Sequence, residues 1–449
     1  MKVRVTAILV SLLVFLTSFF AVAQVQGGVA VAVASAQDLY PVRTQDGVDL
    51  VLQRYRPDAQ SRHNVGAQPV ILMPGLLCNH NFFQVETPAG NDYNLTLPED
   101  LAGWAEGDPY IQADPMRYYS LAYYLWDQGY DVWLANYRGE GREPMRSGGA
   151  VGYAIDELGI YDMPAIVTKV REVTGKKPVW VGHSMGSTMA YIYLQGARFI
   201  DPTMPTSGVV SDDYLRAMRN DGNGPQALKA LVDLDGPVIP GGSIPGLLQP
   251  LLWTALYVPF YLDLRALTAT LGWVAASPAM MLESLARMLW GALGYPDLGL
   301  LNLLLLINPD NMSGEVASYF FQFGLDGVST RVLAQFCDAI VHQKFREHYR
   351  NRGFLSWLRW APPAPCPGDG FYYYSDNLGK ISLPSLVIAD ATRDITNPED
   401  IRRFYDSKAR NDRDKFAVIP GTAHVDLVIG LNAPEELFPL IGEWLESLD

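Results

Sequence analysis

The sequence predicts an α/β protein with a mostly parallel sheet, helices on both faces and a helical segment inserted late in the sheet. Short runs of β-branched and aromatic residues alternate with helical patterns along the first half of the chain. One such run, Val179 to Val181, ends in a glycine-flanked turn that leads directly into a helix-forming sequence. From Gly236 to about Lys380 the strand patterns give way to an apolar, proline-broken helical pattern. Strand patterns resume near Leu383.

The composition sets limits on size and partners. The 449-residue chain is long enough for a large domain with a substantial insertion. Its 34 basic and 48 acidic residues give a net charge of −14 without a basic block, which argues against nucleic acid as a partner. The three cysteines allow at most one disulfide, which we expect between Cys337 and Cys366, with Cys78 left over. No residue spacing suggests a metal site, and no cofactor is implied.

The N-terminus has the pattern of a secretory signal peptide. Lys2 and Arg4 precede an apolar run from Ala7 to Ala23. Small residues that suit cleavage occur at Ala23 and again at Ala36, so residues 1–36 are the predicted signal peptide of a secreted or periplasmic protein. The alternative is an uncleaved membrane anchor, because no charge appears between Arg4 and Asp38.

The first half of the mature chain predicts the start of the sheet. It opens with a hairpin, Tyr40–Thr44 and Val48–Arg56, whose Asp46-Gly47 pair suits a tight turn. Residues 79–115 are polar, acidic and turn-rich, and predict a long loop without a regular element. The further strands expected here are 68–73, 131–136, 178–182 and 228–234, and the expected helices are 116–128 and 161–174.

The second half predicts a helical cap followed by the end of the sheet. Prolines cut residues 236–380 into short helices. A transmembrane segment is an alternative here, although prolines and charges keep each apolar run short or broken. We expect the apolar faces of these helices to pack on the core or to line a lipophilic cleft. Strands at 383–390 and 415–420 and a helix at 435–448 then complete the core. The predicted domains are therefore a core in two parts, 37–235 and 381–449, and a cap, 236–380.

The stretch Gly182-His183-Ser184-Met185-Gly186 has the form G-x-S-x-G between a strand and a helix. This is the setting of a nucleophile elbow, in which the serine sits in a strained, exposed turn. Gly182 and Gly186 lack a Cβ, so the turn can close and the helix can pack against neighbouring strands. The Ser184 hydroxyl then lies at a helix N-terminus, which favours developing negative charge. The alternative is an ordinary glycine-flanked serine in a strand-to-helix turn.

A serine nucleophile needs a base and a carboxylate that orients the base, in the chain order serine, acid, histidine. Asp394 lies in a loop four residues past a strand end, and we prefer it to Asp390, for which the alternative is a turn or capping role. His424 follows the last strand and is the expected base. We expect His183, next to the nucleophile, to point elsewhere.

An oxyanion hole needs two backbone N–H donors. One comes from the residue after the nucleophile, which is Met185. The other comes from the loop after the third strand, where Leu76 follows Gly75, whose lack of a side chain allows close approach.

Several stretches along nearly the whole mature chain also match one known family. They are Thr44-Gln45-Asp46-Gly47, Pro74-Gly75-Leu76-Leu77, the Gly-Tyr-Asp-Val-Trp and Asn-x-Arg-Gly patterns within 129–139, Tyr161-Asp162-Met163-Pro164-Ala165, the elbow, Asp394 and His424-Val425-Asp426. In these residues the chain resembles the acid lipase group of the α/β-hydrolases, which contains gastric and lysosomal lipases and their bacterial relatives. The resemblance implies an α/β-hydrolase fold with Ser184, Asp394 and His424 as the triad, and Leu76 and Met185 as oxyanion donors. It also implies a helical cap over an acyl-chain cleft.

The chain departs from that family at two positions of the site. It has Pro74-Gly75 where the family usually has His-Gly, and Met185 where the family usually has Gln. Hydrolysis is unaffected by these changes, but the substrate stays open among triglycerides, cholesteryl esters, simple esters and polyesters.

The sequence thus predicts a secreted serine hydrolase that cleaves lipid-type carboxylic esters through an acyl-enzyme. Its partner is an apolar ester, and the cap is expected to make transient contact with a lipid interface. An acyltransferase or polyester-active enzyme would use the same triad. A non-catalytic binding protein of the same fold is a further alternative, although the nucleophile and the histidine are both present in order.

Overall fold

The computed structural model describes residues 38–57, 67–241, 253, 259–274, 306–349, 364–366, 368–392 and 396–448. The expected signal peptide, much of the apolar cap sequence and Asp394 lie outside the described residues. Within the ranges that are described, no helix is both long and apolar enough to cross a membrane.

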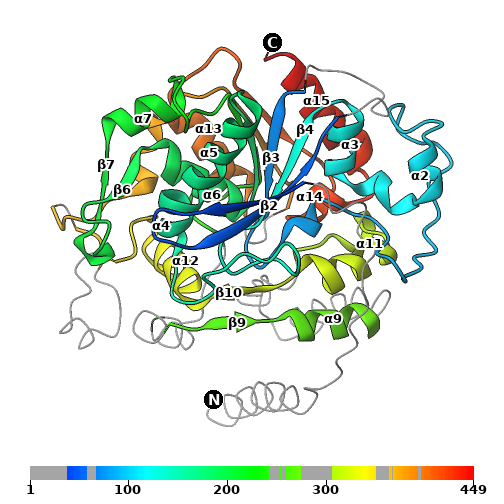
Figure 1. Cartoon of the computed structure of the whole chain (residues 1–449), viewed down its shortest axis with the longest axis horizontal. Coiled ribbons are helices and arrows are strands. Elements are labelled where there is room, and N and C mark those ends of the chain that lie inside the picture. The colour runs from blue at the N-terminus through cyan, green and yellow to red at the C-terminus, as the bar shows by residue number, and fades with distance from the viewer. Residues whose placement is uncertain are drawn as a thin grey trace, which may run out of the picture. The chain divides into compact units, whose positions relative to one another are not determined.

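The core is an eight-stranded sheet with the order β1-β2-β4-β3-β5-β8-β11-β12 (Figure 1). The β1–β2 and β2–β4 pairs are antiparallel, and the other five neighbouring pairs are parallel, which confirms the mostly parallel sheet. The strands of this sheet are β1 Leu39–Arg43, β2 Asp49–Tyr55, β3 Pro69–Met73, β4 Asp131–Ala135, β5 Val179–His183, β8 Ala230–Leu234, β11 Ser385–Ala389 and β12 Lys415–Val418. Two short pairs are separate: β6 Ala197–Phe199 with β7 Val209–Ser211, and β9 Tyr261–Asp263 with β10 Gly327–Ser329.

Helices cover both faces of the sheet. Successive side chains of a strand point to opposite faces, so an apolar strand needs helices on both sides to bury them. In β3, Ile71 and Met73 belong to one apolar cluster, and Val70 and Leu72 belong to the other. The first cluster includes side chains of α4 Ile155–Glu157, α5 Met163–Thr174, α6 Met185–Leu194, α12 Thr330–His342 and α13 Pro398–Ser407. The second includes side chains of α2 Pro109–Ala113, α3 Leu121–Asp127, α11 Gly314–Tyr319, α14 Asp426–Ile429 and α15 Phe438–Glu446. The remaining described α-helices are α7 Asp213–Asn220 and α9 Arg265–Val274.

Capping side chains explain where three expected elements differ. Residues 79–115 are not without an element, because Asp108 accepts from the N–H of Tyr110 at 2.8 Å and starts α2. The expected helix 116–128 is broken at Ser120, whose hydroxyl accepts from Tyr123 N at 3.1 Å and starts α3. The helix expected from 161 begins earlier, with α4, where the Glu157 side chain accepts from Ala154 N at 2.9 Å.

The insertion between β8 and β11 also differs from expectation. Strand structure is present within 236–380, because β9 and β10 pair with each other in antiparallel fashion. Each has three residues, too few for a strand pattern to be read from the sequence. The expected bridge between Cys337 and Cys366 is not formed, since Cys337 is a buried thiol in α12 and Cys366 is an exposed one.

Arg138 joins three of the stretches that carry the family resemblance. Its guanidinium donates to the Asp162 carboxylate, with a shortest distance of 2.6 Å, and to Asp46 Oδ2 at 2.7 Å. The side chain of Asp162 is fully buried and that of Arg138 is 5% exposed, so each charge is compensated inside the fold. These contacts tie the hairpin turn and the start of α5 to the loop that follows β4, which lies beside the site described next.

Candidate active site

Ser184 sits in a sharp turn between β5 and α6. Its backbone has φ 53° and ψ −120°, a conformation that costs energy for any residue with a Cβ. The turn is held by hydrogen bonds from Ser184 N to Leu234 O at 2.9 Å and from Trp180 Nε1 to Gly186 O at 2.9 Å. This is the geometry of a nucleophile elbow.

Three glycines around the serine leave no space for a side chain. A Cβ at Gly182 would lie 2.5 Å from the carbonyl carbon of Gly186, and a Cβ at Gly186 would lie 2.3 Å from Met73 O. A Cβ at Gly75 would lie 2.7 Å from the Cβ of Ser184. The loop after β3 therefore approaches the nucleophile as closely as its backbone allows.

The two expected oxyanion donors lie on either side of this contact. Met185 is the first residue of α6, so its N–H is one of those that a helix leaves without an intrahelical partner. Leu76 follows Gly75, whose carbonyl oxygen accepts from Tyr137 Oη at 3.1 Å. Throughout the described ranges, neither the Leu76 nor the Met185 N–H donates to an acceptor of the protein. Both donors are thus available to a developing oxyanion.

His424 lies in the turn between β12 and α14, and the backbone of that turn is anchored from both sides. The carbonyl oxygen of His424 accepts from His183 Nε2 at 2.9 Å. The next N–H, of Val425, donates to Leu306 O at 2.8 Å. The imidazole side chain itself is 4% exposed.

Asp235 provides a buried carboxylate to the His424 imidazole. Its Oδ2 lies 2.5 Å from His424 Nδ1, and its side chain is fully buried. Because a carboxylate at Nδ1 selects the tautomer that carries its proton there, the lone pair of the imidazole is on Nε2. The same Oδ2 accepts from Thr396 Oγ1 at 2.6 Å, and Oδ1 accepts from Asp390 N at 3.3 Å.

Sequence reasoning missed Asp235, which directly follows the strand expected at 228–234. The cause is strand order, since β8 lies between β5 and β11 in the sheet. A carboxylate at the end of β8 is one strand from Ser184, whereas one after β11 is two strands away. Asp394 stays an untested prediction, because it is not among the described residues. An aspartate at the end of the first sheet strand after the elbow is the signal that points to Asp235.

We expected His183 to point away from the site, and this was wrong. Its ring packs against that of His424, the expected base. Its ring centroid lies 4.6 Å from that of His424 and 4.6 Å from that of Phe82. Burial lowers the pKa of His183 well below the usual range, so this imidazole is neutral. Its role is to hold the His424 backbone.

Asp235, Asp390 and His424 also form a buried cluster of metal-ligand type, with one ligand atom from each within 4.8 Å of the others. His424 Nδ1 and Asp235 Oδ2 lie 2.5 Å apart, which is closer than two ligand atoms of the same metal ion lie to each other. The cluster is therefore arranged as a hydrogen-bonded acid–base pair.

Comparisons with known proteins agree with the observed fold. A model of the alpha/beta hydrolase fold matches residues 97–220. Human lipase member K is 42% identical over 346 residues, which cover 73% of this chain and 75% of that protein. Human gastric triacylglycerol lipase is 31% identical over 161 residues, covering 34% of this chain and 33% of that lipase. Lipase lipl-3 of Caenorhabditis elegans is 31% identical over 168 residues, covering 35% of this chain and 34% of that lipase. The matches to the last two thus span about a third of their length.

Proposed function

We propose that this chain, which belongs to the acid lipase family of the α/β-hydrolases, hydrolyses carboxylic esters of lipid type through an acyl-enzyme on Ser184. The observation that carries the proposal is the buried pair of His424 and Asp235 next to a strained serine turn. A strained backbone at a serine and an imidazole paired with a carboxylate occur together in sites where the serine is activated as a nucleophile. The lipase names of the relatives support an ester of lipid type.

In the first half-reaction Ser184 Oγ attacks the ester carbonyl carbon while His424 Nε2 accepts the hydroxyl proton. Asp235 stabilises the resulting imidazolium through Nδ1. The N–H groups of Leu76 and Met185 stabilise the negative charge that develops on the carbonyl oxygen. When the tetrahedral intermediate collapses, the ester C–O bond breaks and His424 returns the proton to the leaving alcohol.

In the second half-reaction water takes the place of the alcohol. His424 removes a proton from water, the hydroxide attacks the acyl carbon, and the bond to Ser184 Oγ breaks. Ser184 recovers its proton from His424, and the carboxylic acid leaves. No redox step or cofactor takes part in this scheme.

The proposal assigns the orienting role to Asp235 in place of the predicted Asp394. Its support is the direct hydrogen bond to His424, together with two further donors that keep the carboxylate in place.

The organisation of the chain also belongs to the proposal. Residues 1–36 act as a signal peptide for export, in line with their charged start, apolar run and small-residue sites. Residues 236–380 form a cap between the two core segments, 37–235 and 381–449, and its apolar sequence suits contact with acyl chains or a lipid interface.

The test is hydrolysis of p-nitrophenyl esters of increasing acyl length by the wild type, Ser184→Ala and Ser207→Ala. Ser207 lies in the loop between β6 and β7, where its hydroxyl accepts from Asp201 N, so it is a matched control. We expect turnover with an optimum at medium or long chains, a loss of roughly a thousandfold or more in Ser184→Ala, and normal activity in Ser207→Ala. Equal rates for wild type and Ser184→Ala, or no turnover by any of the three, would contradict the proposal.

A further inference from the structure

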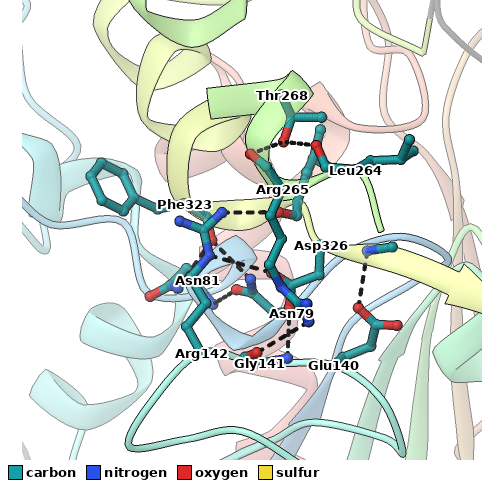
Figure 2. Close-up of polar contacts among 12 residues, drawn as sticks. Asn79, Asn81, Glu140, Gly141, Arg142, Leu264, Arg265, Thr268, Phe323 and Asp326 are labelled. Atoms are coloured by element: carbon teal, nitrogen blue, oxygen red, sulfur yellow. Dashed lines mark hydrogen bonds and ion pairs between the residues drawn. The ribbon is translucent and has the colours of Figure 1, made fainter. Parts of the chain in front are cut away.

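A turn of the insertion is bonded directly to the loop that carries the oxyanion donor. We call Pro74–Asn79 the oxyanion loop and Phe323–Asp326 the insert turn. The two are joined as neighbouring strands are, with an isolated antiparallel bridge between Cys78 and Leu325. The backbone bonds across this joint are Asp326 N to Leu77 O at 2.8 Å and Asn79 N to Gly324 O at 2.9 Å. A side-chain bond joins Asn79 Nδ2 to Phe323 O at 2.8 Å (Figure 2).

Asp326 ends the insert turn, and its carboxylate gathers three donors from two other segments. Oδ2 accepts from Gly141 N at 2.6 Å, in the loop after β4. Oδ1 accepts from Arg265 Nε of α9 at 3.1 Å and lies 3.4 Å from Arg142 Nε (Figure 2). The carboxylate is fully buried, so the arginines and the N–H replace its lost hydration.

Both arginines make further contacts within the same joint. Arg265 Nη2 donates to Gly139 O at 3.2 Å and to Gly141 O at 3.3 Å. Arg142 Nη2 donates to Leu325 O at 3.1 Å. The two guanidiniums thus bridge α9, the insert turn and the loop after β4.

Glu140 is the second carboxyl group near Asp326. It contacts Tyr261 Oη at 3.1 Å and accepts from Gly327 N at 3.3 Å. Burial raises the pKa of Glu140 well above the usual range, which disfavours its ionised form. Arg142 and Arg265 therefore form their ion pairs in this joint with Asp326. Arg265 also pairs with Asp263, at 2.8 Å.

We propose that Asp326 is a positioning residue that sets the oxyanion hole by locking the insert turn against the oxyanion loop. Its backbone N–H holds the carbonyl of Leu77, the residue directly after the donor Leu76. Leu77 has φ 67°, a backbone conformation that needs support from its surroundings. The proposal rests on the proposed function, because it assumes that the Leu76 N–H stabilises an oxyanion.

The lock matters because oxyanion donors act only in a narrow range of positions. A group displaced by about 1 Å costs on the order of a hundredfold in rate. Ground-state binding of the acyl chain does not use these N–H groups, so releasing the lock reduces kcat more than it raises KM.

The experiment compares Asp326→Asn and Arg265→Met with Asp131→Asn. Asp131 is a matched control, since it is 2% exposed, pairs with Arg54 at 2.7 Å and starts β4, at the end of the strand away from this joint. The concentration of active sites is first determined by titration with a phosphonate. We expect kcat per site on a p-nitrophenyl ester to fall at least about tenfold in Asp326→Asn, with KM changed much less. Asp131→Asn is expected to lower the midpoint of thermal unfolding and to keep kcat.

Hydrogen–deuterium exchange gives a second measurement that does not need turnover. The peptides that cover 75–79 and 323–326 should exchange faster in Asp326→Asn and in Arg265→Met than in the wild type. The proposed role of Asp326 would be overturned if kcat per site in both Asp326→Asn and Arg265→Met equalled that of Asp131→Asn, or if exchange over 75–79 were unchanged. Wild-type turnover that does not depend on Ser184 overturns the proposed function instead, so the two failures are seen in different measurements.

Discussion

Asp235 is fixed at the end of β8 by its own backbone as well as by its side-chain donors. Its N–H donates to Ile388 O at 2.8 Å, and its φ of 57° turns the chain sharply after the strand. The Thr396 hydroxyl and the Asp390 N–H then approach the carboxylate from the β11 side. These contacts hold the carboxylate in addition to its bond with His424, which is the preorganisation that the proposed catalytic pair requires.

The choice between the two candidate acids can be measured directly. We expect Asp235→Asn to lower kcat by roughly a thousandfold or more, because an amide can donate to Nδ1 and favour the wrong tautomer of His424. Asp394→Asn, the control, should keep kcat close to that of the wild type. Steady-state kinetics of both variants on one soluble ester are sufficient. If only Asp394→Asn is impaired, the orienting role belongs to Asp394, as the sequence predicts.

At the scale of single elements, β8 carries a second buried carboxyl group two residues before Asp235. Asp233 accepts from Tyr191 Oη at 2.5 Å and from Gly236 N at 2.8 Å, and so connects β8 to α6 and to the turn that follows the strand. Burial raises the pKa of Asp233 to about 7, and the hydrogen bonds compensate only in part. The strand therefore includes a carboxyl group that is protonated in the folded protein over a wide acidic range.

This raised pKa makes stability depend on pH in a defined direction. Unfolded Asp233 titrates near 4, so between about pH 4 and 7 the folded state binds the proton and the unfolded state does not. The contribution is fully present below about pH 4 and is lost as the pH rises to about 7, by roughly 1.4 kcal/mol per pH unit.

Asp233→Asn removes this titration and keeps the shape of the side chain. Urea unfolding midpoints at several pH values between 4 and 7 should therefore fall less steeply with pH in the variant than in the wild type. Identical pH slopes for the two proteins would contradict the raised pKa of Asp233.

At the scale of the molecule, the long apolar strands were predictable from the sequence because they are buried on both faces. Such strands appear as continuous apolar runs, and all strands of the main sheet were expected within a few residues. The β6–β7 and β9–β10 pairs were not predicted. Each of these four strands has three residues, and its pairing depends on contacts made after the chain has folded.

The site was predictable only where its chemistry is local in sequence. The elbow depends on five consecutive residues around Ser184, and the geometry of that turn follows from them. The acid depends on which strand lies beside the elbow, and the sheet order that decides this is not visible in the sequence. The lock on the oxyanion loop joins Leu77 to Asp326, about 250 residues further along the chain, and no local pattern marks such a contact.

The proposed chemistry depends on the activation of Ser184 as a nucleophile by His424. It is tested most directly by treating the purified protein with an alkyl p-nitrophenyl phosphonate and mapping the adduct by mass spectrometry. We expect one phosphonyl group per chain, attached to Ser184, and a labelling rate lower by at least about a hundredfold in His424→Ala. An unmodified Ser184, or labelling of Ser184 that proceeds equally fast without His424, would contradict it.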